Sequence, residues 1–591
     1  MRRRQSLGFL GLALLGLGLY RFRRHLLGYW LGLRPHRHAV TVRRGLKIAM
    51  PDGVQLAADH YAPSSTRLYP TVLIRTPYGR SQAAGLSGVM PDFIARRFAE
   101  RGYNVLVQDV RGRFDSQGEF EPFVHEESDG RTTLDWLEKQ AWFNGVLGMW
   151  GQSYLGYVQW AIAPGAPLYL KALLPAVTGS QLPQADRQDG ALGLDMLLRW
   201  FIQMDDMDRL KGRTGIFQTW RFNAALQERR LQRAARRLPL GEADQVATGR
   251  SIPYYQDVLR GLDAQTAPTN QAVPSPRVKH LTAAVHLVSG WQDFLLRQLL
   301  ADYEDMRLSG QHPYLTIGPW NHLDLECLWE TLRQGLTWFD ACLKGDRSGL
   351  RENPVRIYVM GKNQWREMES WPPFSNPVRY YLHAAQDGRP ACSGRLLLDA
   401  PAESSPPDTY TYDPAHPTPS LGGALMTWQG GVVDNRTLEK RADVITYTSS
   451  ILEKELEIIG PVQLVLYVRS SLEYTDFFAR LCDVTPAGRS LNVCDGLLRL
   501  RPGLGVPQPD GSLRLQVELW PTAYCFLPGH CLRLQVSSGA HPRWNRNLGT
   551  GEPVLTGVRM LKAEQTLYHD QEHPAELILP GTEEVSNASP A

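Results

Sequence analysis

The chain of 591 residues is predicted to form an α/β domain that carries a helical insertion and is followed by an all-β domain. Three patterns predict this order. Short apolar strands alternate with helices up to about residue 179, helical patterns fill residues 180–275, and short strands with alternating apolar residues dominate beyond residue 353. The composition, with 43% hydrophobic and 21% charged residues, excludes a wholly disordered or coiled-coil chain.

The α/β domain is predicted to comprise residues 39–179 and 276–352, with a mostly parallel sheet. Its strands are short apolar runs bounded by turn residues, and between the first two of them Pro91 suits a first helical turn and Gly102 suits the position after the helix. Strand–helix alternation favours parallel pairing, because the helices make the crossover connections. Strands are expected at 71–75, 103–110, 146–150, 284–289 and 314–317, and helices at 91–101, 128–140 and 154–162.

Residues 180–275 interrupt the α/β pattern and are predicted to form a helical cap. Helical patterns cover 194–210 and 217–238, and no strand-like run lies between them. A helical insertion in an α/β sheet commonly covers a site at the ends of the strands. We therefore expect this segment to form a lid.

Residues 353–580 are predicted to form a β-sandwich or jelly roll. Many short strands separated by Pro- and Gly-rich turns are typical of this class. The clearest alternation of apolar and polar residues covers 513–519 and 532–536, and further strands are expected at 462–468 and 477–484. Residues 581–591 are expected to be a disordered tail.

The N-terminal segment, residues 1–38, has the features of a signal or membrane-anchor sequence. Three arginines precede an apolar run of about fourteen residues, but no small-x-small cleavage site follows, and the run is shorter than the ~20 residues that span a bilayer. This pattern predicts membrane association or export, with a cytoplasmic protein that carries an N-terminal helix as the alternative. The rest of the chain has an acidic excess, which predicts no nucleic-acid partner.

The strongest local signal for catalysis is Ser153, which lies between a predicted strand and a predicted helix. Gly151 and Gly156 flank it, as expected where a sharp strand-to-helix turn leaves no room for side chains. The second glycine comes one place later than in the usual G-x-S-x-G pattern. Such a turn exposes the hydroxyl and directs the amide of Tyr154 toward the same space. A serine in a glycine-rich turn without a catalytic role is the alternative.

A serine nucleophile needs a base and an orienting acid, and two residues in the expected chain order can provide them. Asp293 follows the predicted strand 284–289, and His322 follows the predicted strand 314–317. The alternatives are a helix-capping aspartate and an ordinary histidine. Tyr78, after the strand 71–75, could donate its hydroxyl to an oxyanion or pack as a turn aromatic.

No pattern in the chain predicts a metal or a cofactor. The seven cysteines form no C-x-x-C pair and show no zinc-ligand spacing with histidine, so buried reduced thiols are expected. The run from Asp109 to Gly118 lacks the alternating oxygen ligands of a calcium loop. We interpret Asp109 and Arg111 in it as structural residues beside the site.

Ten short motifs together resemble the CocE/NonD hydrolase family, and the resemblance extends over residues 40–575. It implies a triad of Ser153, Asp293 and His322, an oxyanion hole from the Tyr78 hydroxyl and the Tyr154 amide, and no cofactor. It also implies an α/β-hydrolase domain with a helical cap, followed by a galactose-binding-like jelly roll. The motifs are Arg75–Tyr78, Asp109–Gly112, Gly151–Gly156, Gly290–Asp293, Gly318–His322, Val359–Gly361, Tyr412–Pro414, Thr475–Phe477, Asp495–Gly496 and Leu519–Thr522.

The residues around Asp293 narrow the substrate class. The resemblance implies extra carboxylates after this aspartate in α-amino acid ester hydrolases, whereas here Phe294 and Leu295 follow it, and an ammonium against an apolar wall would be costly. Trp291, Phe294 and Leu295 are predicted to line an apolar acyl pocket, with a place in the core as the alternative.

The sequence therefore predicts a serine hydrolase that cleaves small-molecule carboxylic esters, or amides, through an acyl-enzyme. One alternative is an Xaa-Pro dipeptidyl peptidase, which needs acids for a peptide N-terminus. Asp205, Asp206 and Asp208 are candidates for that role, although a solvated helix face is the simpler interpretation. A non-catalytic binding protein is the other alternative, and the oligomeric state stays open.

Overall fold

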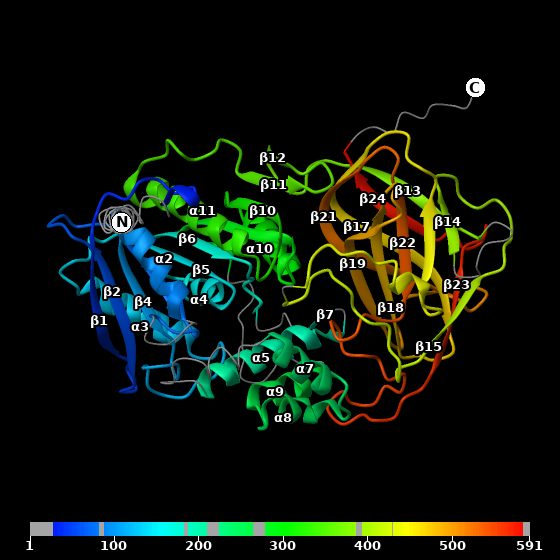
Figure 1. The fold of residues 1–591 in the computed structure, drawn as a ribbon, viewed down its shortest axis with the longest axis horizontal. Helices are drawn as coiled ribbons and strands as arrows, with labels where there is room; N and C mark the ends of the chain where they lie inside the picture. The colour runs from blue at the N-terminus through cyan, green and yellow to red at the C-terminus, as the bar shows by residue number, and fades with distance from the viewer. Residues whose placement is uncertain are drawn as a thin grey trace, which may run out of the picture.

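A computed structural model describes residues 28–81, 88–182, 187–188, 190–209, 224–263, 278–385, 393–427 and 429–582. An α/β region and an all-β region lie side by side, and a group of helices lies below the line where they meet (Figure 1). The predicted fold class, an α/β domain with a helical insertion followed by an all-β domain, is confirmed.

The α/β region is built on a ten-stranded sheet with the order β1-β2-β4-β3-β5-β6-β9-β10-β11-β12. All neighbours from β4 to β11 are parallel, which confirms the predicted mostly parallel sheet. The central strands β3 and β4 are buried along their whole length, because helices cover both faces. The strands are β1 Val40–Ala49, β2 Gln55–Pro63, β3 Thr71–Thr76, β4 Asn104–Asp109, β5 Leu147–Gln152, β6 Leu170–Ala176, β9 Ala284–Gln292, β10 Tyr314–Asn321, β11 Val355–Val359 and β12 Gln364–Met368.

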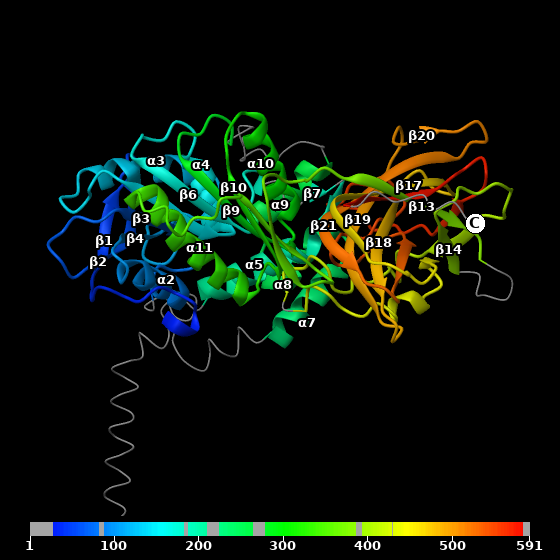
Figure 2. The same ribbon diagram turned by 90° about the horizontal axis from the view of Figure 1, so that it is seen from above.

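Helices cover the sheet on both sides (Figure 2). One side is covered by α2 and α11, whose apolar residues share a core cluster that includes Phe98 and Phe339. The other side is covered by α3, α4 and α10, which contribute Leu134, Val158 and Leu299 to a second cluster. Gly102, with φ +81°, follows α2 as predicted. The helices are α2 Val89–Ala99, α3 Glu126–Glu138, α4 Tyr154–Ile162, α10 Leu296–Leu308 and α11 Leu325–Lys344.

The α/β sheet continues past residue 353, where the sequence pattern becomes all-β. β11 pairs in parallel with β10, and β12 pairs antiparallel with β11, so both belong to the first sheet. The reason for the difference is local. β11 alternates buried and half-buried residues, which is also the pattern of a sandwich strand. The all-β sheet begins with β13 Asn376–His383.

The inserted segment forms a helical cap. Its helices are α5 Leu194–Arg209, α7 Ala224–Ala235, α8 Ala243–Thr248 and α9 Pro253–Asp263, with a short 3₁₀ turn at Leu240–Glu242 and a small hairpin of β7 Arg187–Gln188 and β8 Ala191–Leu192. The predicted helix over 217–238 begins outside the described residues, and α7 is its described part.

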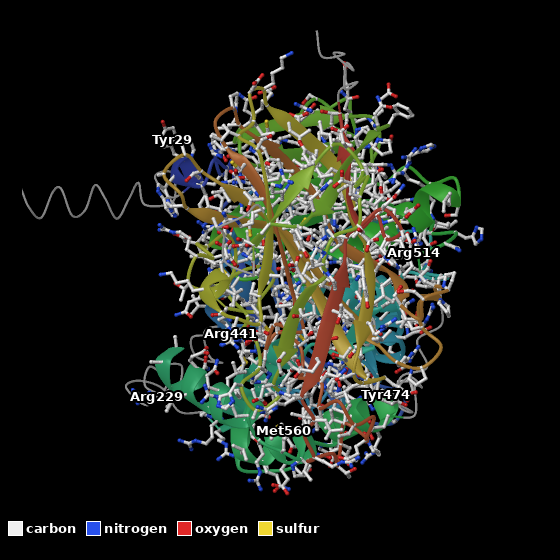
Figure 3. All side chains as sticks on the ribbon, turned by 90° about the vertical axis from the view of Figure 1, so that its right-hand side faces the viewer. Tyr29, Arg229, Arg441, Tyr474, Arg514 and Met560 are labelled. Atoms are coloured by element: carbon white, nitrogen blue, oxygen red, sulfur yellow. The ribbon has the colours of Figure 1, made fainter. Side chains whose placement is uncertain are left out.

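The C-terminal region is a twelve-stranded all-β domain, seen from its outer side in Figure 3. Backbone hydrogen bonds between Met360 and the strand β21, at Ala523 and Cys525, join it to the α/β region. A Cβ on Gly361 would lie 2.0 Å from the Cys525 carbonyl oxygen, so only glycine fits at this junction. The further strands are β14 Ser393–Leu397, β15 Asp408–Tyr412, β16 Ile445–Ser449, β17 Leu456–Ser470, β18 Thr475–Val484, β19 Ser490–Leu500, β20 Val506–Pro507, β21 Leu513–Phe526, β22 Cys531–Ser537, β23 Ala563–Tyr568 and β24 Glu576–Gly581.

Most of the signal-like segment lies outside the described residues, which begin at Gly28. Its last part docks on the α/β domain: Leu31 and Leu33 are buried, whereas Tyr29 and Trp30 are 88% and 72% exposed. Within the described ranges, no helix combines the length and the apolar character that crossing a bilayer requires. The predicted tail begins one residue too early, because Gly581 is the last residue of β24 and pairs with Asn376 of β13; residues 583–591 lie outside the description.

Candidate active site

Ser153 occupies a strained turn between β5 and α4. Its backbone has φ 56° and ψ −123°, a conformation that residues other than glycine rarely adopt. A hydrogen bond of 2.8 Å from its amide to the Ala176 carbonyl fixes the turn. A Cβ on Gly151 would lie 2.3 Å from the Leu155 Cβ. Close packing of the helix on this turn therefore requires a glycine before the serine.

The position of the second glycine also has a steric reason. A Cβ on Gly156 would lie 2.5 Å from Cγ2 of Thr178, a residue that follows β6. The first turn of α4 therefore packs directly on the segment after the neighbouring strand, and this contact falls at residue 156 rather than residue 155.

Asp293 and His322 follow β9 and β10, which are adjacent parallel strands. Because parallel strands end at the same edge of a sheet, both residues lie at the edge where Ser153 follows β5. His322 Nε2 lies 3.1 Å from Ser153 Oγ, and His322 Nδ1 lies 2.8 Å from Asp293 Oδ2. The Leu295 amide donates to the other carboxylate oxygen of Asp293 at 2.6 Å. The structure thus brings the three predicted residues into one hydrogen-bonded relay.

Tyr78 reaches the same site from the end of β3. Its hydroxyl accepts a hydrogen bond of 3.3 Å from the Trp200 indole, and its ring lines one cavity with Ser153 and Tyr154. Burial raises the pKa of Tyr78, although hydrogen bonds with Trp200 and Ser153 act in the opposite direction. The hydroxyl therefore keeps its proton at neutral pH and is able to donate. Tyr154 is the first residue of α4, where an amide has no partner within the helix.

The residue that supports the Tyr78 turn is Arg113, which the sequence analysis did not single out. It donates to the Pro77 carbonyl at 2.9 Å and forms an ion pair with Asp208 of the cap. Asp109, which the sequence analysis interprets as structural, forms an ion pair with Arg80 at 2.5 Å.

Arg111, the other residue interpreted as structural, pairs with Asp129 and Asp52, at 2.6 and 2.5 Å. These partners lie on the first turn of α3 and before β2. The ion pairs of Arg111 therefore join parts of the α/β domain to each other.

A small apolar cavity of about 40 Å³ lies over Ser153. Phe294 and Leu295, which the sequence predicts as residues of an acyl pocket, line it, and Phe294 also packs on His322 with the ring centroids 4.2 Å apart. The cap and the all-β domain supply walls that the sequence did not reveal. The inserted segment contributes Leu182, Met196, Leu197, Trp200 and Tyr254, and the all-β domain contributes Met426. Phe123 of the α/β domain, which the sequence did not indicate either, completes the wall.

Trp291 does not line this cavity, which corrects its predicted role. It is 3% exposed, its indole donates to the Tyr358 carbonyl at 2.7 Å, and its ring packs against Trp371. Trp291 lies within β9, before the chain turns toward the site at Asp293, so its side chain is directed into the core.

Of the three candidate acids of α5, Asp205 and Asp206 do not lie on a solvated face, whereas Asp208 is exposed, as the simpler interpretation of the sequence expects. Asp205 and Asp206 are 1% and 0% exposed, and arginines surround them. Asp206 pairs with Arg230 at 2.7 Å, and Asp205 pairs with Arg209 and Arg250 at 2.9 and 3.0 Å. Their charge is therefore compensated inside the cap.

A second group of serine, histidine and aspartate occurs in the all-β domain. Ser405 Oγ lies 3.1 Å from His569 Nδ1, and His569 Nε2 lies 3.0 Å from Asp408 Oδ2. Ser405 precedes β15 and is not followed by a helix, so it has no helix N-terminus to bind an oxyanion. The strained turn and the amide of α4 distinguish Ser153 from this group.

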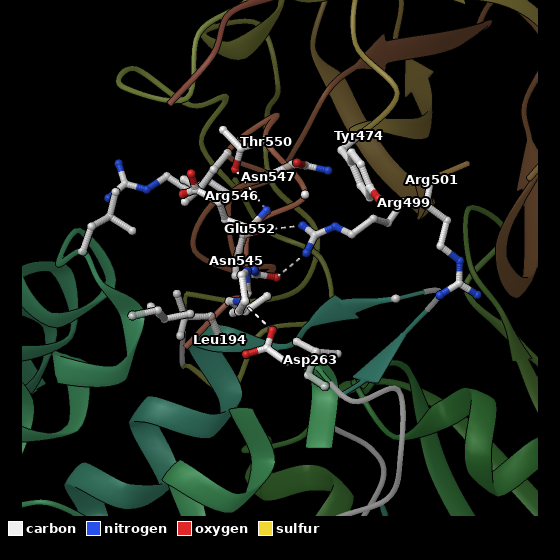
Figure 4. A pocket seen from close by; sticks show the side chains of 18 of the residues that line it. Leu194, Asp263, Tyr474, Arg499, Arg501, Asn545, Arg546, Asn547, Thr550 and Glu552 are labelled. Atoms are coloured by element: carbon white, nitrogen blue, oxygen red, sulfur yellow. Dashed lines mark hydrogen bonds between the residues drawn. The ribbon is translucent and has the colours of Figure 1, made fainter. Parts of the chain in front are cut away.

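A cavity of about 470 Å³ lies between the cap and the all-β domain (Figure 4). Asp263 of the cap accepts from the amides of residues 554 and 555 of the all-β domain, and these hydrogen bonds join the two parts. Arg499 pairs with Asp476 and donates to Asn545 at 2.9 Å, and these contacts lie within the all-β domain. The cavity is not lined by Ser153, Asp293 or His322, whereas Ser153 lines the smaller cavity.

Comparison with known proteins identifies the family. Residues 52–324 match the model of the X-Pro dipeptidyl-peptidase (S15 family), and residues 349–578 match that of the X-Pro dipeptidyl-peptidase C-terminal non-catalytic domain. Cocaine esterase of Rhodococcus sp. (strain MB1 Bresler) is 32% identical over 574 residues, which cover 91% of this chain and 98% of that protein. The chain belongs to the CocE/NonD hydrolase family. It is accordingly a serine hydrolase of the acyl-esterase type.

Solved structures share the fold of this CocE/NonD hydrolase. An α-amino acid ester hydrolase superposes with a TM-score of 0.74 at 23% identity, and an aminopeptidase from a marine-sediment Thaumarchaeota archaeon superposes with 0.75 at 21% identity. In both cases the match covers 93% of this chain and 98% of the other. At these identities the likeness concerns the fold alone.

Proposed function

We propose that this CocE/NonD hydrolase cleaves esters of compact apolar carboxylic acids with Ser153, Asp293 and His322 as its catalytic triad. The observation that carries the proposal is the pair of contacts made by His322: its Nε2 lies 3.1 Å from Ser153 Oγ, and its Nδ1 lies 2.8 Å from Asp293 Oδ2. The serine itself lies in a strained turn. A base within hydrogen-bond distance of the hydroxyl is the geometric requirement for activating a serine.

In the proposed mechanism, Ser153 Oγ attacks the ester carbonyl carbon while His322 Nε2 takes the hydroxyl proton. The tetrahedral intermediate collapses, the C–O bond to the alcohol breaks, and His322 returns the proton to the leaving alkoxide. Water then attacks the acyl-enzyme with His322 as base, and the acid is released. Asp293 keeps the imidazole oriented and stabilises its cation.

We propose that the Tyr78 hydroxyl and the Tyr154 amide form the oxyanion hole. Tyr78 and Tyr154 both line the cavity over Ser153, one after the end of β3 and the other at the start of α4. Donors that are fixed before the reaction stabilise the developing charge without reorganisation, and this is commonly the largest catalytic contribution.

The cavity supports a compact apolar acyl group. Its volume of about 40 Å³ is less than a tenth of the volume of the cavity between the cap and the all-β domain, which is about 470 Å³. Aromatic and aliphatic side chains make up most of its wall, with Phe294, Leu295 and Trp200 among them. We therefore expect acetyl and propionyl esters to be better substrates than benzoyl esters.

Parallel assays test ester hydrolysis against the Xaa-Pro peptidase alternative. Purified protein is given p-nitrophenyl acetate and Ala-Pro-p-nitroanilide, and Ser153→Ala is the control. We expect turnover of the ester that the Ser153→Ala variant lacks, and little turnover of the anilide, since arginines pair with Asp205 and Asp206. Preferential hydrolysis of the anilide would instead favour the peptidase.

We also propose that residues 1–38 associate with a membrane. The described end of this segment supports the proposal: Tyr29 and Trp30 are exposed, and aromatic residues of this kind favour the bilayer interface. Residues 31–38 dock firmly, for example through the Arg37 amide, which donates to the Glu100 carbonyl at 2.8 Å. Sedimentation with anionic vesicles should pull down the full chain and leave a chain lacking residues 1–30 in solution. Equal sedimentation of both chains would contradict this proposal.

A further inference from the structure

Phe123 forms one wall of the cavity over Ser153 in an unusual backbone conformation. Its φ of +71° lies in the left-handed region, which costs a side chain other than glycine on the order of 1–3 kcal/mol. The ring stacks on Tyr154, with centroids 4.8 Å apart and planes at 23°, and lies parallel to Trp200 at 6.0 Å. Something must therefore hold this backbone in place.

The hydroxyl of Tyr154 holds the Phe123 backbone in this conformation. The Phe123 amide donates to this hydroxyl at 3.0 Å, and the hydroxyl donates in turn to Glu126 Oε1 at 2.7 Å. Burial and the nearby Glu126 carboxylate raise the pKa of Tyr154, so the phenol keeps the proton that it donates. The same residue thus offers its amide to the proposed oxyanion hole and its side chain to the wall of the cavity.

Glu126 is itself anchored in the core. Its other carboxylate oxygen lies 2.9 Å from Arg75 Nη1, and the same guanidinium donates to the Glu126 carbonyl at 2.8 Å and to Gln108 at 2.8 Å. Arg75, Glu126 and Tyr154 are 0%, 3% and 1% exposed. A continuous chain of contacts therefore runs from β3 to Phe123 without reaching solvent.

We propose that Phe123 is a steric gate that limits the size of the acyl group, and that Tyr154 and Glu126 are positioning residues that hold the gate closed. Held in the left-handed conformation, the Phe123 ring occupies space beside Ser153 that a larger acyl group would need. Without the hydroxyl, the Phe123 amide loses its acceptor and the strained backbone is released. The inference rests on the proposed ester hydrolysis and specifies its substrate range.

The test compares kcat/KM for p-nitrophenyl acetate, butyrate and benzoate in a double-mutant cycle. Phe123→Ala should raise the ratio of kcat/KM for the benzoate to kcat/KM for the acetate by about tenfold, because the enlarged cavity then admits the benzoyl group more readily. Tyr154→Phe should shift the ratio in the same direction, and in the Phe123→Ala background it should add no further shift. Tyr169→Phe removes a phenol that donates to the Leu134 carbonyl at 3.0 Å and should leave the ratio unchanged.

Two results would overturn the gate. Either an unchanged ratio in Phe123→Ala, or a Tyr154→Phe shift that persists in full without the Phe123 ring, would show that the hydroxyl does not act through this side chain. Glu126→Gln provides a second variant: it keeps the hydroxyl but loses the ion pair with Arg75, so it should move the ratio in the same direction as Tyr154→Phe and by less, even if it lowers the melting temperature. If the wild type hydrolyses none of the three esters, the proposed function itself fails, and that outcome is distinct from a failed gate.

Discussion

Replacing Tyr78 by phenylalanine deletes the one side-chain hydroxyl proposed for the oxyanion hole and keeps the ring. Loss of one such donor lowers kcat by roughly 10²–10³, or ~2.7–4 kcal/mol. The cavity of about 40 Å³ can admit a water molecule in place of the hydroxyl, and Trp200 and Ser153 offer it polar partners. We therefore expect the lower end, a decrease in kcat of about 10²-fold.

The assay is steady-state hydrolysis of p-nitrophenyl acetate. KM should change little, because the negative charge on the oxygen develops only in the transition state. Tyr103→Phe is the matched control: it removes a buried hydroxyl that donates to Asp340 at 2.6 Å, near the opposite end of the strands. Its kcat should stay within about twofold of the wild type. A Tyr78→Phe enzyme that is folded and retains the wild-type kcat would refute the assignment.

Three further predictions follow from the structure. Gly156→Ala places a methyl group 2.5 Å from Thr178 Cγ2 and should destabilise the protein by about 1–3 kcal/mol. In thermal melts, Thr178→Ala should partly restore the stability of this variant. If Gly156→Ala is as stable as the wild type, the packing argument is contradicted. Asp293→Asn should lower kcat by roughly 10⁴ with the fold intact, because the imidazole loses its orienting carboxylate; a small effect would exclude Asp293 as the acid. Burial raises the pKa of Asp302 to about 7, above its value in the unfolded chain, so its contribution to stability is lost as pH rises toward 7. The melting temperature of Asp302→Asn minus that of the wild type should therefore increase as the pH is raised from 5 to 8. A difference that stays constant over this range would contradict the argument.

The proposed triad could be predicted from the sequence because each of its residues has a local signal. Ser153 lies in a glycine-rich turn, and Asp293 and His322 each directly follow an apolar strand. Parallel pairing then places the ends of these strands at one edge. Trp291, two residues before Asp293, has the same local context, and only the packed structure shows that its indole bonds to Tyr358 inside the core.

The walls that the cap and the all-β domain supply could not be predicted in this way. Trp200 and Tyr254 belong to cap helices and Met426 to the all-β domain, and their positions depend on how these parts pack on the sheet. Their sequence context is that of ordinary core residues. The burial of Asp205 and Asp206 has a similar origin, because two of the arginines that compensate them, Arg230 and Arg250, come from other segments of the cap.

Covalent labelling with a fluorophosphonate tests the central claim most directly. The account predicts one phosphonyl group per chain, found by peptide mass spectrometry on Ser153, no label in Ser153→Ala, and slow labelling in His322→Ala. A label that persists in Ser153→Ala, for instance on Ser405 of the second serine–histidine–aspartate group, would contradict it.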